Sequence, residues 1–191
     1  MTDSSAIRLL VYKEITPGDL RKFSANASNV TTGRGARDLR FPHDIFDPIF
    51  ARLLPTLVDM PGRRNKVASM VAVRTGPVRW YVNDVEGSTN VEYWPPNEAR
   101  PGEGRWAKVN TIPLFRIAQR DDEGRIVILL VQNFEGNVYL YIETETRLRT
   151  PEWNSEVVDA IFSCSDSKKN GTRSAALGYI DFDQDKKYCH G

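Results

Sequence analysis

The sequence has few residues of the kinds that build metal centres or disulfide frameworks. Its 191 residues include two cysteines, Cys164 and Cys189, and two histidines, His43 and His190. A zinc cluster or a histidine-based nuclease site needs more ligands than these. Two cysteines without a secretory signal do not indicate a disulfide framework. We therefore expect a cytoplasmic protein with no metal site.

Long apolar runs, a strong net charge and catalytic motifs are also missing. No segment approaches the length of a membrane span, so no membrane partner is expected. The formal net charge is +1, which excludes a globally basic protein but not a local basic cluster. Neither a phosphate-binding loop nor a Gly-x-Ser-x-Gly motif occurs. The chain is therefore not expected to be an enzyme by itself or to need a cofactor.

The densest acidic run lies near the end of the chain, with Asp181, Asp183 and Asp185 on alternate residues. A calcium loop would need glycine at the position of Lys186, so the run does not match one. A solvated tail is the expected structure. A metal-dependent nuclease centre at these carboxylates remains an alternative.

The composition is typical of one β-rich domain. Hydrophobic residues make up 40% of the chain, and 13 Gly and 11 Pro provide many turns. Apolar alternation predicts strands over residues 7–15, 67–74, 78–83, 111–117, 126–132 and 138–143. Turn signals at residues 75–77, 121–124 and 135–137 predict that strands joined by these turns pair in antiparallel fashion. Such strands hide their edges by closing into a barrel.

Two helices are predicted to cap the barrel. Residues 44–54 carry apolar side chains at helical spacing, with Asp47 as the cap and Pro48 at the first regular position. Residues 152–163 form the second helix. The fold class is thus α+β, mainly β, with a domain over residues 1–165. Residues 166–191 are predicted to be a polar extension, partly disordered or the start of a linker.

A glycine-rich stretch from Phe23 to Pro42 forms the first predicted arm. Its candidate DNA-binding residues are Arg34, Gly35, Arg37 and Arg40. Glycine lets backbone N–H groups approach a phosphate, and the arginine fork makes bidentate contacts with phosphate or guanine. The alternative, to which we give equal weight, is a solvated turn in which these arginines pair with Asp38 and Asp44.

A second polar arm is predicted from Gly87 to Arg105. Its candidate DNA-binding residues are Ser88, Thr89, Asn90, Glu92, Tyr93, Trp94 and Arg105. Asparagine can bind adenine and glutamate can accept from cytosine, whereas Tyr93 and Trp94 are favoured as packed anchors. Arg63, Arg64 and Lys66 add possible phosphate contacts, with a solvated loop as the alternative.

The order of several short motifs resembles the DNA-binding pseudobarrel of the N-terminal effector-binding domain in EcoRII-type restriction endonucleases. The residues that carry the resemblance are Ser24-Ala25-Asn26, Thr32-Gly33, Leu39, Pro42, Ile49, Leu53, Tyr81-Val82-Asn83, Gly87, Thr89, Glu92, Val157 and Ala160. The similarity spans roughly residues 11–165. It implies two arms that clamp the major groove of double-stranded DNA.

The resemblance also implies that Glu92 reads a base and that cutting is done by a separate nuclease domain. The basic residues that flank this glutamate in the family are replaced here, and Trp94 stands in place of an arginine. The target sequence is therefore expected to differ. The chain is then either the recognition half of a longer restriction enzyme or a specificity protein with a separate nuclease partner. Mg²⁺ would be needed only by that nuclease, and cytosine methylation could be part of the recognised sequence.

The rival interpretation is a barrel-like module that binds protein or a small ligand and whose arms are only long loops. The near-neutral charge favours this interpretation. A steep loss of affinity with salt would favour DNA instead, because several phosphate contacts release counterions.

Overall fold

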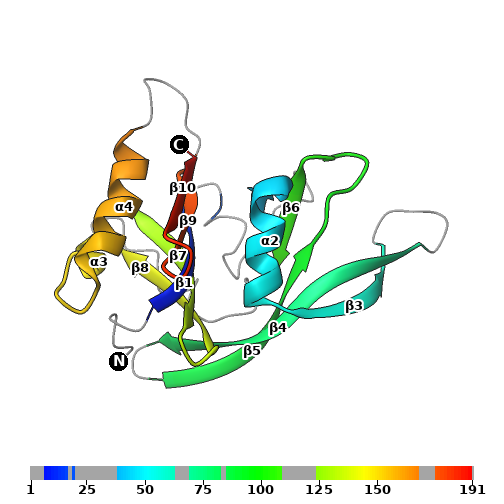
Figure 1. The fold of residues 1–191 in the computed structure, drawn as a ribbon, viewed down its shortest axis with the longest axis horizontal. Coiled ribbons are helices and arrows are strands. Elements are labelled where there is room, and N and C mark those ends of the chain that lie inside the picture. Colours follow the sequence, from blue (N-terminus) through cyan, green and yellow to red (C-terminus); the bar gives the residue numbers. More distant parts are fainter. Residues whose placement is uncertain are drawn as a thin grey trace, which may run out of the picture.

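The computed structural model describes residues 7–16, 19, 38–62, 69–82, 85–108, 124–167 and 175–190. In these ranges the chain forms one curled sheet, a half-barrel, with helices beside it (Figure 1). In sequence order the elements are β1 (Ile7–Ile15), β2 (Leu39–Pro42), α2 (His43–Leu53), β3 (Thr56–Pro61), β4 (Met70–Val82), β5 (Val85–Trp94), β6 (Glu103–Ala107), β7 (Ile126–Asn133), β8 (Val138–Thr144), α3 (Glu145–Leu148), α4 (Ser155–Asp166), β9 (Leu177–Asp181) and β10 (Lys186–His190). The prediction of a mainly β fold is confirmed.

The strands pair in the order β10-β9-β1-β7-β8-β4-β5-β6-β2, and β3 pairs with β4 beside this path. The pairings between described strands are antiparallel except for a short parallel contact between β4 and β8. The sheet has two halves in Figure 1. The first, from β10 to β8, lies beside α3 and α4, and the second, from β4 to β2 with β3, lies beside α2. Strand β4 joins the halves.

The central strands of the first half are covered on both faces. In β1, Leu9 and Val11 belong to the core shared with α2, whereas Leu10 and Tyr12 belong to the core against α4. The strand β7 alternates between the same two cores. A strand covered on both faces needs a nearly continuous apolar run, which is what β7 has.

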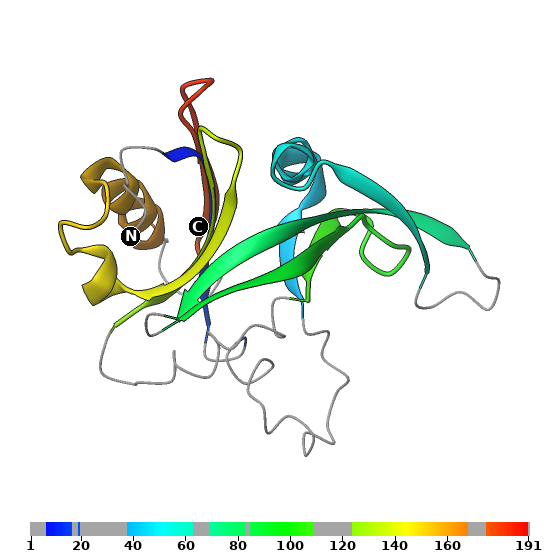
Figure 2. The same cartoon turned by 90° about the horizontal axis from the view of Figure 1, so that it is seen from below.

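Helix α2 covers one face of the second half. Phe46 packs against Phe41 of β2, with ring centroids 4.9 Å apart, and Phe50 lies 6.1 Å from Trp106 of β6. Figure 2 shows α2 on one side of the long ribbon of β4 and β5. The opposite face of this half, away from α2, is called the outer face below.

The position of the first predicted helix and its buried face are confirmed, but its predicted start is wrong. Helix α2 begins at His43, and Pro48 lies inside it instead of at its first position. A proline removes the N–H that would bind the carbonyl of Asp44. The side chains of Phe46 and Phe50 are fully buried, so packing outweighs that lost hydrogen bond. The second predicted helix begins later, at Ser155, because Asn154 accepts a hydrogen bond from the N–H of Glu156 and caps it.

Two predicted loops are strands. The hairpin turn predicted at residues 75–77 lies inside β4, where Gly76 leaves space for Leu54 of α2 instead of making a turn. The predicted arm from Gly87 to Arg105 is mostly β5 and β6, with a connection between them. By contrast, the turn at residues 135–137 joins β7 to β8, with Gly136 at φ +86°. The predicted strand at 111–117 lies outside the described residues.

The end of the chain pairs into the sheet, beyond residue 165, where the predicted domain ends. Strand β9 pairs with β1, and β10 pairs with β9. Tyr188 of β10 packs against Phe46 of α2, with ring centroids 5.8 Å apart. The polar residues Lys186 and Lys187 are exposed on this edge strand, which explains why the sequence resembles a solvated tail.

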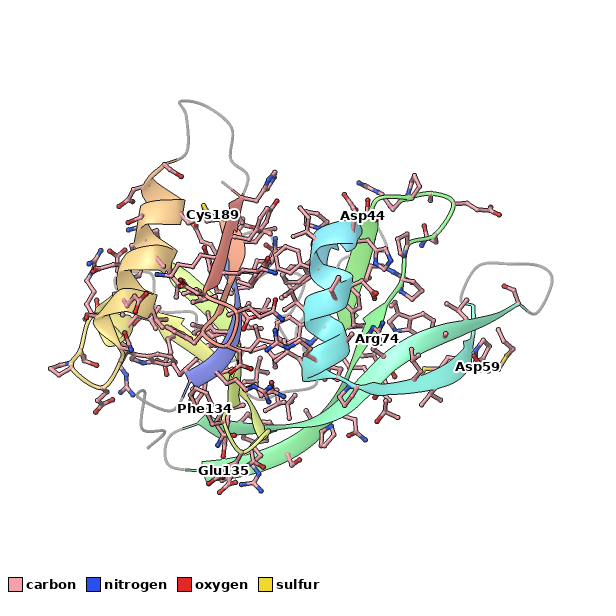
Figure 3. All side chains as sticks on the ribbon, in the orientation of Figure 1. Asp44, Asp59, Arg74, Phe134, Glu135 and Cys189 are labelled. Atoms are coloured by element: carbon pink, nitrogen blue, oxygen red, sulfur yellow. A yellow bond between two sulfur atoms is a disulfide. The ribbon has the colours of Figure 1, made fainter. Side chains whose placement is uncertain are left out.

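The two cysteines form a disulfide, which the sequence did not indicate. Cys164 on α4 is bonded to Cys189 on β10, labelled in Figure 3. Cys164 is buried and Cys189 is exposed. The antiparallel return of β9 and β10 beside α4 brings them together, and spacing alone does not predict that return. Among the helices described, none is both long and apolar enough to span a membrane.

Two arginines, Arg125 just before β7 and Arg149 just after α3, converge on Glu145 at the start of α3. Arg125 donates from Nε and Nη2 to the two carboxylate oxygens, at 2.8 and 3.1 Å, and Arg149 donates to Oε1 at 2.9 Å. Both guanidinium groups lie over the ring of Phe162 in α4, at 4.7 and 4.4 Å from its centroid. These hydrogen bonds, first that from Arg125 and then that from Arg149, lower the pKa of Glu145 from 4.5 to about 2.

This shift predicts a loss of stability in acid. Because the folded pKa lies below the unfolded pKa, the contribution of Glu145 is present above pH 4.5 and is lost as the pH falls towards 2. We expect Glu145→Gln to lower the free energy of unfolding by about 2 kcal/mol at pH 7 and by much less at pH 2.5, measured by denaturant unfolding. Glu152→Gln, at a carboxylate with 57% exposure, is the control and should change little at either pH.

Candidate nucleic-acid interface

The register of the second half places the predicted DNA-binding residues on two different faces. Residues directly opposite each other in an antiparallel pair share a face. Arg40 is opposite Arg105, which is opposite Trp94, so these three side chains share the outer face. Tyr93 and Trp106 are opposite each other on the face covered by α2. The alternation of polar and apolar side chains over residues 103–108 could have indicated that they point to two faces. It could not have shown which strands would be neighbours.

A chain of ion pairs crosses the outer face from β2 to β6. Arg40 Nη1 is 3.2 Å from a carboxylate oxygen of Glu103, and its Nε is 3.9 Å from Asp38. Arg105 Nη1 lies 3.7 Å from the other oxygen of Asp38. The alternative in which Arg40 pairs with Asp38 is therefore seen in the structure. Asp38 is only 8% exposed, so a nearly buried carboxylate orients the guanidinium groups of both arginines.

The same chain of contacts continues to Glu92 of β5. Its side chain accepts a hydrogen bond from Trp94 Nε1 at 2.9 Å and is paired with Lys108 Nζ at 2.5 Å. The Arg105 guanidinium lies over the Trp94 ring, 5.5 Å from its centroid. Glu92 is 2% exposed, so in this conformation its carboxylate meets protein groups and not solvent. The predicted base-reading glutamate thus forms the centre of an internal network.

Lys108 has an unusual backbone as well as an ion pair. It follows β6 with φ +62°, a left-handed conformation that residues with a Cβ adopt rarely. Its side chain remains 47% exposed while it pairs with Glu92. Such conformations persist where surrounding contacts fix them. Glu92 is one such contact, so it positions an exposed ammonium group at the end of β6.

The exposed part of the outer face lies on the β4–β5 ribbon. Ser88 and Asn90 of β5 and Arg79 of β4 are exposed. Ser88 is opposite Arg79, and Asn90 is opposite Pro77, so their side chains share the outer face. Thr89 is half-buried and points to the other side, with Val78. Sequence reasoning missed Arg79, although its alternation with buried Val78 was a usable signal.

Tyr93 and Trp94 are buried, as expected of anchors, although they lie in a strand and not in a loop. Tyr93 stacks on Phe50 of α2 with ring centroids 4.0 Å apart, and its hydroxyl lies 3.3 Å from His43 Nδ1. A side chain at Gly104 would occupy the place of the Tyr93 hydroxyl. Burial, with a smaller effect of the Asp47 carboxylate, raises the Tyr93 pKa well above its ordinary value.

Six predicted DNA-binding residues lie outside the described residues. They are Arg34, Gly35, Arg37, Arg63, Arg64 and Lys66. By sequence, Arg34 and Arg37 come immediately before Asp38 and β2, and the other three lie between β3 and β4. The structure therefore describes Arg40, Arg105 and the β5 residues among the predictions.

The acidic run near the end of the chain is paired with arginines. Asp181 is 2% exposed and forms an ion pair with Arg52 of α2. Asp183 pairs with Arg52, at 3.2 Å, and with Arg8 of β1. Within the described ranges no group of three or more potential metal-binding side chains is found. The observed role of Asp181 and Asp183 is to connect β1, α2 and β9.

No protein-family model and no curated protein matches this chain. The outer face combines an ordered row of basic groups with an exposed polar ribbon, and it lies opposite the face that α2 covers.

Proposed function

We propose that the chain is a recognition module that binds double-stranded DNA through the outer face and catalyses no reaction by itself. The observation that supports it most is the gathering of Arg40, Arg105 and Lys108 at one end of this face. Basic groups on adjacent strands, about 5 Å apart, suit contacts with phosphate oxygens. In sequence, Arg34 and Arg37 directly precede the strand that carries Arg40.

The acidic partners orient these basic groups. Asp38 is shared by Arg40 and Arg105, and Glu92 holds Lys108. Side chains fixed before binding lose less entropy when they meet a ligand. Arg40 and Lys108 keep 32% and 47% of their side-chain surface exposed, so part of each is accessible to a phosphate. Binding would exchange one ionic contact for another, so we expect moderate affinity that falls with salt.

The β4–β5 ribbon is the proposed base-reading part. Strand β3 pairs with β4 up to Thr75, and β6 pairs with β5 from Glu92. Between Thr75 and Arg79, β4 therefore pairs only with β5 among the described strands, so the sheet is two-stranded there. The major groove admits a two-stranded ribbon, and asparagine can bind adenine there with two hydrogen bonds. Exposed Asn90, opposite Pro77, lies in that part.

The bases are read by Asn90 and Ser88 of the ribbon and not by Glu92, which is buried. A buried carboxylate that already accepts from Trp94 and pairs with Lys108 would have to give up both contacts to reach a base. Breaking such a pair leaves an uncompensated buried charge. Asn90 and Ser88 need no such change because they are exposed. Glu92 is instead proposed to position Lys108 beside the DNA backbone.

The resemblance to the EcoRII-type effector-binding domain belongs to the same proposal. A nuclease domain or nuclease subunit would then do the cutting, with Mg²⁺ as its cofactor, while this chain supplies recognition and needs none. The expected place is the cytoplasm. Disulfides are rare in that reducing compartment and are usually transient or regulatory there, so the state of Cys164 and Cys189 in cells bears directly on this part.

A protein- or ligand-binding module is the second candidate. It is favoured by the acidic residues Asp38, Glu92 and Glu103, which offset the basic groups of the outer face. A module of that kind would show no common affinity for duplexes. The same binding experiment separates the two candidates.

The first test is selection of bound duplexes from a randomised library, in unmodified and cytosine-methylated pools, at near-physiological salt. We expect enrichment of one short site. Asn90→Ala should cost about 1–3 kcal/mol on that site and relax one base position, because it removes a base contact. Arg40→Ala should weaken all duplexes similarly and reduce the slope of log affinity against log salt by about one.

Arg147→Ala is the matched control. Arg147 is an exposed, ion-paired arginine of α3, in the other half of the molecule, and its removal should leave duplex binding unchanged. Recovery of no duplex above background would reject DNA binding. If Asn90→Ala and Arg147→Ala give the same preferred sequence as the unchanged protein, the ribbon is not the reader.

A further inference from the structure

Strand β3 is an exposed edge that carries apolar side chains. Leu57, Val58 and Met70 are 57%, 39% and 61% exposed, and with Phe134 they are the exposed large hydrophobic residues found in the described part of the chain. The first two lie on β3, and Met70 lies opposite Pro61 on β4. The β3–β4 ribbon extends away from the helices, with Asp59 towards its outer end (Figure 3). Because successive residues of a strand point to opposite faces, Leu57 and Val58 place exposed apolar surface on both faces of this edge.

The hydrogen-bonding pattern shows which backbone groups of β3 point outwards. The N–H of Gly62 donates to the carbonyl of Ser69 at 2.8 Å. In an antiparallel ladder, residues that bond to the neighbour alternate with residues that point away. Thr56, Val58 and Met60 therefore bond to β4, and Leu57 and Asp59 direct their N–H and C=O groups outwards. No other strand in the described part of the chain pairs with these groups, which form a short edge between Pro55 and Pro61.

The other edges of the sheet have features that hinder pairing with another strand. Strand β3 has such features only at its ends, where Pro55 and Pro61 lie. Strand β10 exposes Lys186 and Lys187 and is joined to α4 by the disulfide. Strand β2 has four residues and ends at Pro42. Charged, short or covalently fixed edges resist pairing with another strand. In β3 the exposed apolar residues and the open groups of Leu57 and Asp59 favour pairing.

We propose that β3 pairs in antiparallel fashion with β3 of a second copy of this chain, around a two-fold axis between the two Val58 residues. Leu57 of each copy then lies opposite Asp59 of the other. Their outward N–H and C=O groups make four hydrogen bonds, and the two sheets become continuous. Pro55 meets Pro61 at each end, where neither can donate, so the ladder stops there.

This register is the one that suits the side chains. The two Val58 residues face each other across the axis, and each Leu57 covers the stem of an aspartate. A register centred on Asp59 would place two carboxylates directly opposite each other, which is destabilising. A two-fold arrangement uses the same surface on both copies, and β3 is self-complementary in this way.

The size of the edge sets the strength of the dimer. Six residues of one strand bury less surface than the roughly 1,000 Å² expected of a stable biological interface. The dimer is therefore weak and its population depends on concentration, and we expect a dissociation constant on the order of 10–100 µM. This inference does not depend on the proposed DNA function.

The test is sedimentation equilibrium of the whole chain from about 5 to 300 µM, a range that brackets the expected constant. The unchanged protein should shift from monomer to dimer. Asp59→Pro removes an outward N–H without touching the bonds to β4, and should raise the dissociation constant at least about tenfold. Asp59→Ala is the matched control, because it keeps that N–H and removes only the carboxylate, so it should dimerise at least as well as the unchanged protein.

A second variant tests the register and guards against misfolding of the first. Val58→Cys should form a covalent dimer on mild oxidation with oxidised glutathione, because a non-hydrogen-bonded pair brings two Cα atoms to about 4.5 Å. Thr56→Cys, opposite Met60 in this register, should not. A protein that remains monomeric at the highest concentration, or an Asp59→Pro variant that dimerises as the unchanged protein does, would overturn the proposal.

Discussion

Replacement of Arg52 by methionine should lower the free energy of unfolding by about 3 kcal/mol, since removing one partner of a buried ion pair leaves the other uncompensated. The partner is Asp181, whose side chain is 1% exposed. Arg52 also contacts Asp183, so the change removes the link from α2 to the β9–β10 connection. Methionine keeps most of the side-chain volume, which limits the effect to the lost charge. Denaturant unfolding at pH 7 measures it.

Two further variants distinguish this explanation from a general loss of packing. Arg100→Ala, at an exposed arginine that pairs with Glu103, should change the stability by less than about 0.5 kcal/mol. Asp181→Asn in the Arg52→Met background should recover part of the loss, because it removes the uncompensated charge. If Asp181→Asn lowers the stability further in that background, the carboxylate is needed for its hydrogen bonds to the N–H groups of Asp183 and Gln184 and not for Arg52.

Loss of the disulfide should have an effect of similar size. Cys189→Ser opens a loop closed across a sequence separation of 25 residues, and loops of that length contribute about 3 kcal/mol. For a protein of this size the loss corresponds to a fall of roughly 6–12 °C in the melting temperature. Strand β10 should be the first element released, because it pairs only with β9 among the described strands. Thermal unfolding followed by circular dichroism measures the change.

Reduction is the natural comparison for this variant. In the presence of a dithiol reductant, the unchanged protein and Cys189→Ser should melt at nearly the same temperature. Alkylation of the protein in denaturant before reduction should label neither cysteine, and alkylation in denaturant after reduction should label both. Labelling of both cysteines in freshly purified, unreduced protein would contradict the bond, and the same labelling in intact cells would show which state exists there.

The elements that could be predicted are those whose side chains are buried on both faces or on one clear face. Strands β1, β7 and β8 are long apolar runs, and α2 and α4 repeat apolar residues every three or four positions. In these segments one sequence period matches one structure, and packing agrees with local preference. Their positions were therefore predictable to within a few residues.

The elements that were missed depend on their neighbours. Strand β5 reads as a polar loop because its outer face carries Ser88 and Asn90, and β10 reads as a tail because its lysines are exposed. Both are strands because another strand satisfies their backbone groups. The burial of Glu92 could not be predicted for the same reason. Its partner Lys108 is brought beside it only by the register of β5 and β6.

Strand β4 ties the stability of one half of the sheet to that of the other. Its 13 residues pair with β8 near one end and with β3 near the other, so a single stretch of backbone crosses from the first half to the second. The core against α2 uses β1, β7 and β8 as well as β2, β5 and β6. Removal of either half would therefore open the core against α2, whereas the core against α4 lies within the first half alone. A truncation between the halves is consequently expected to destabilise both, because each contributes side chains to the core against α2.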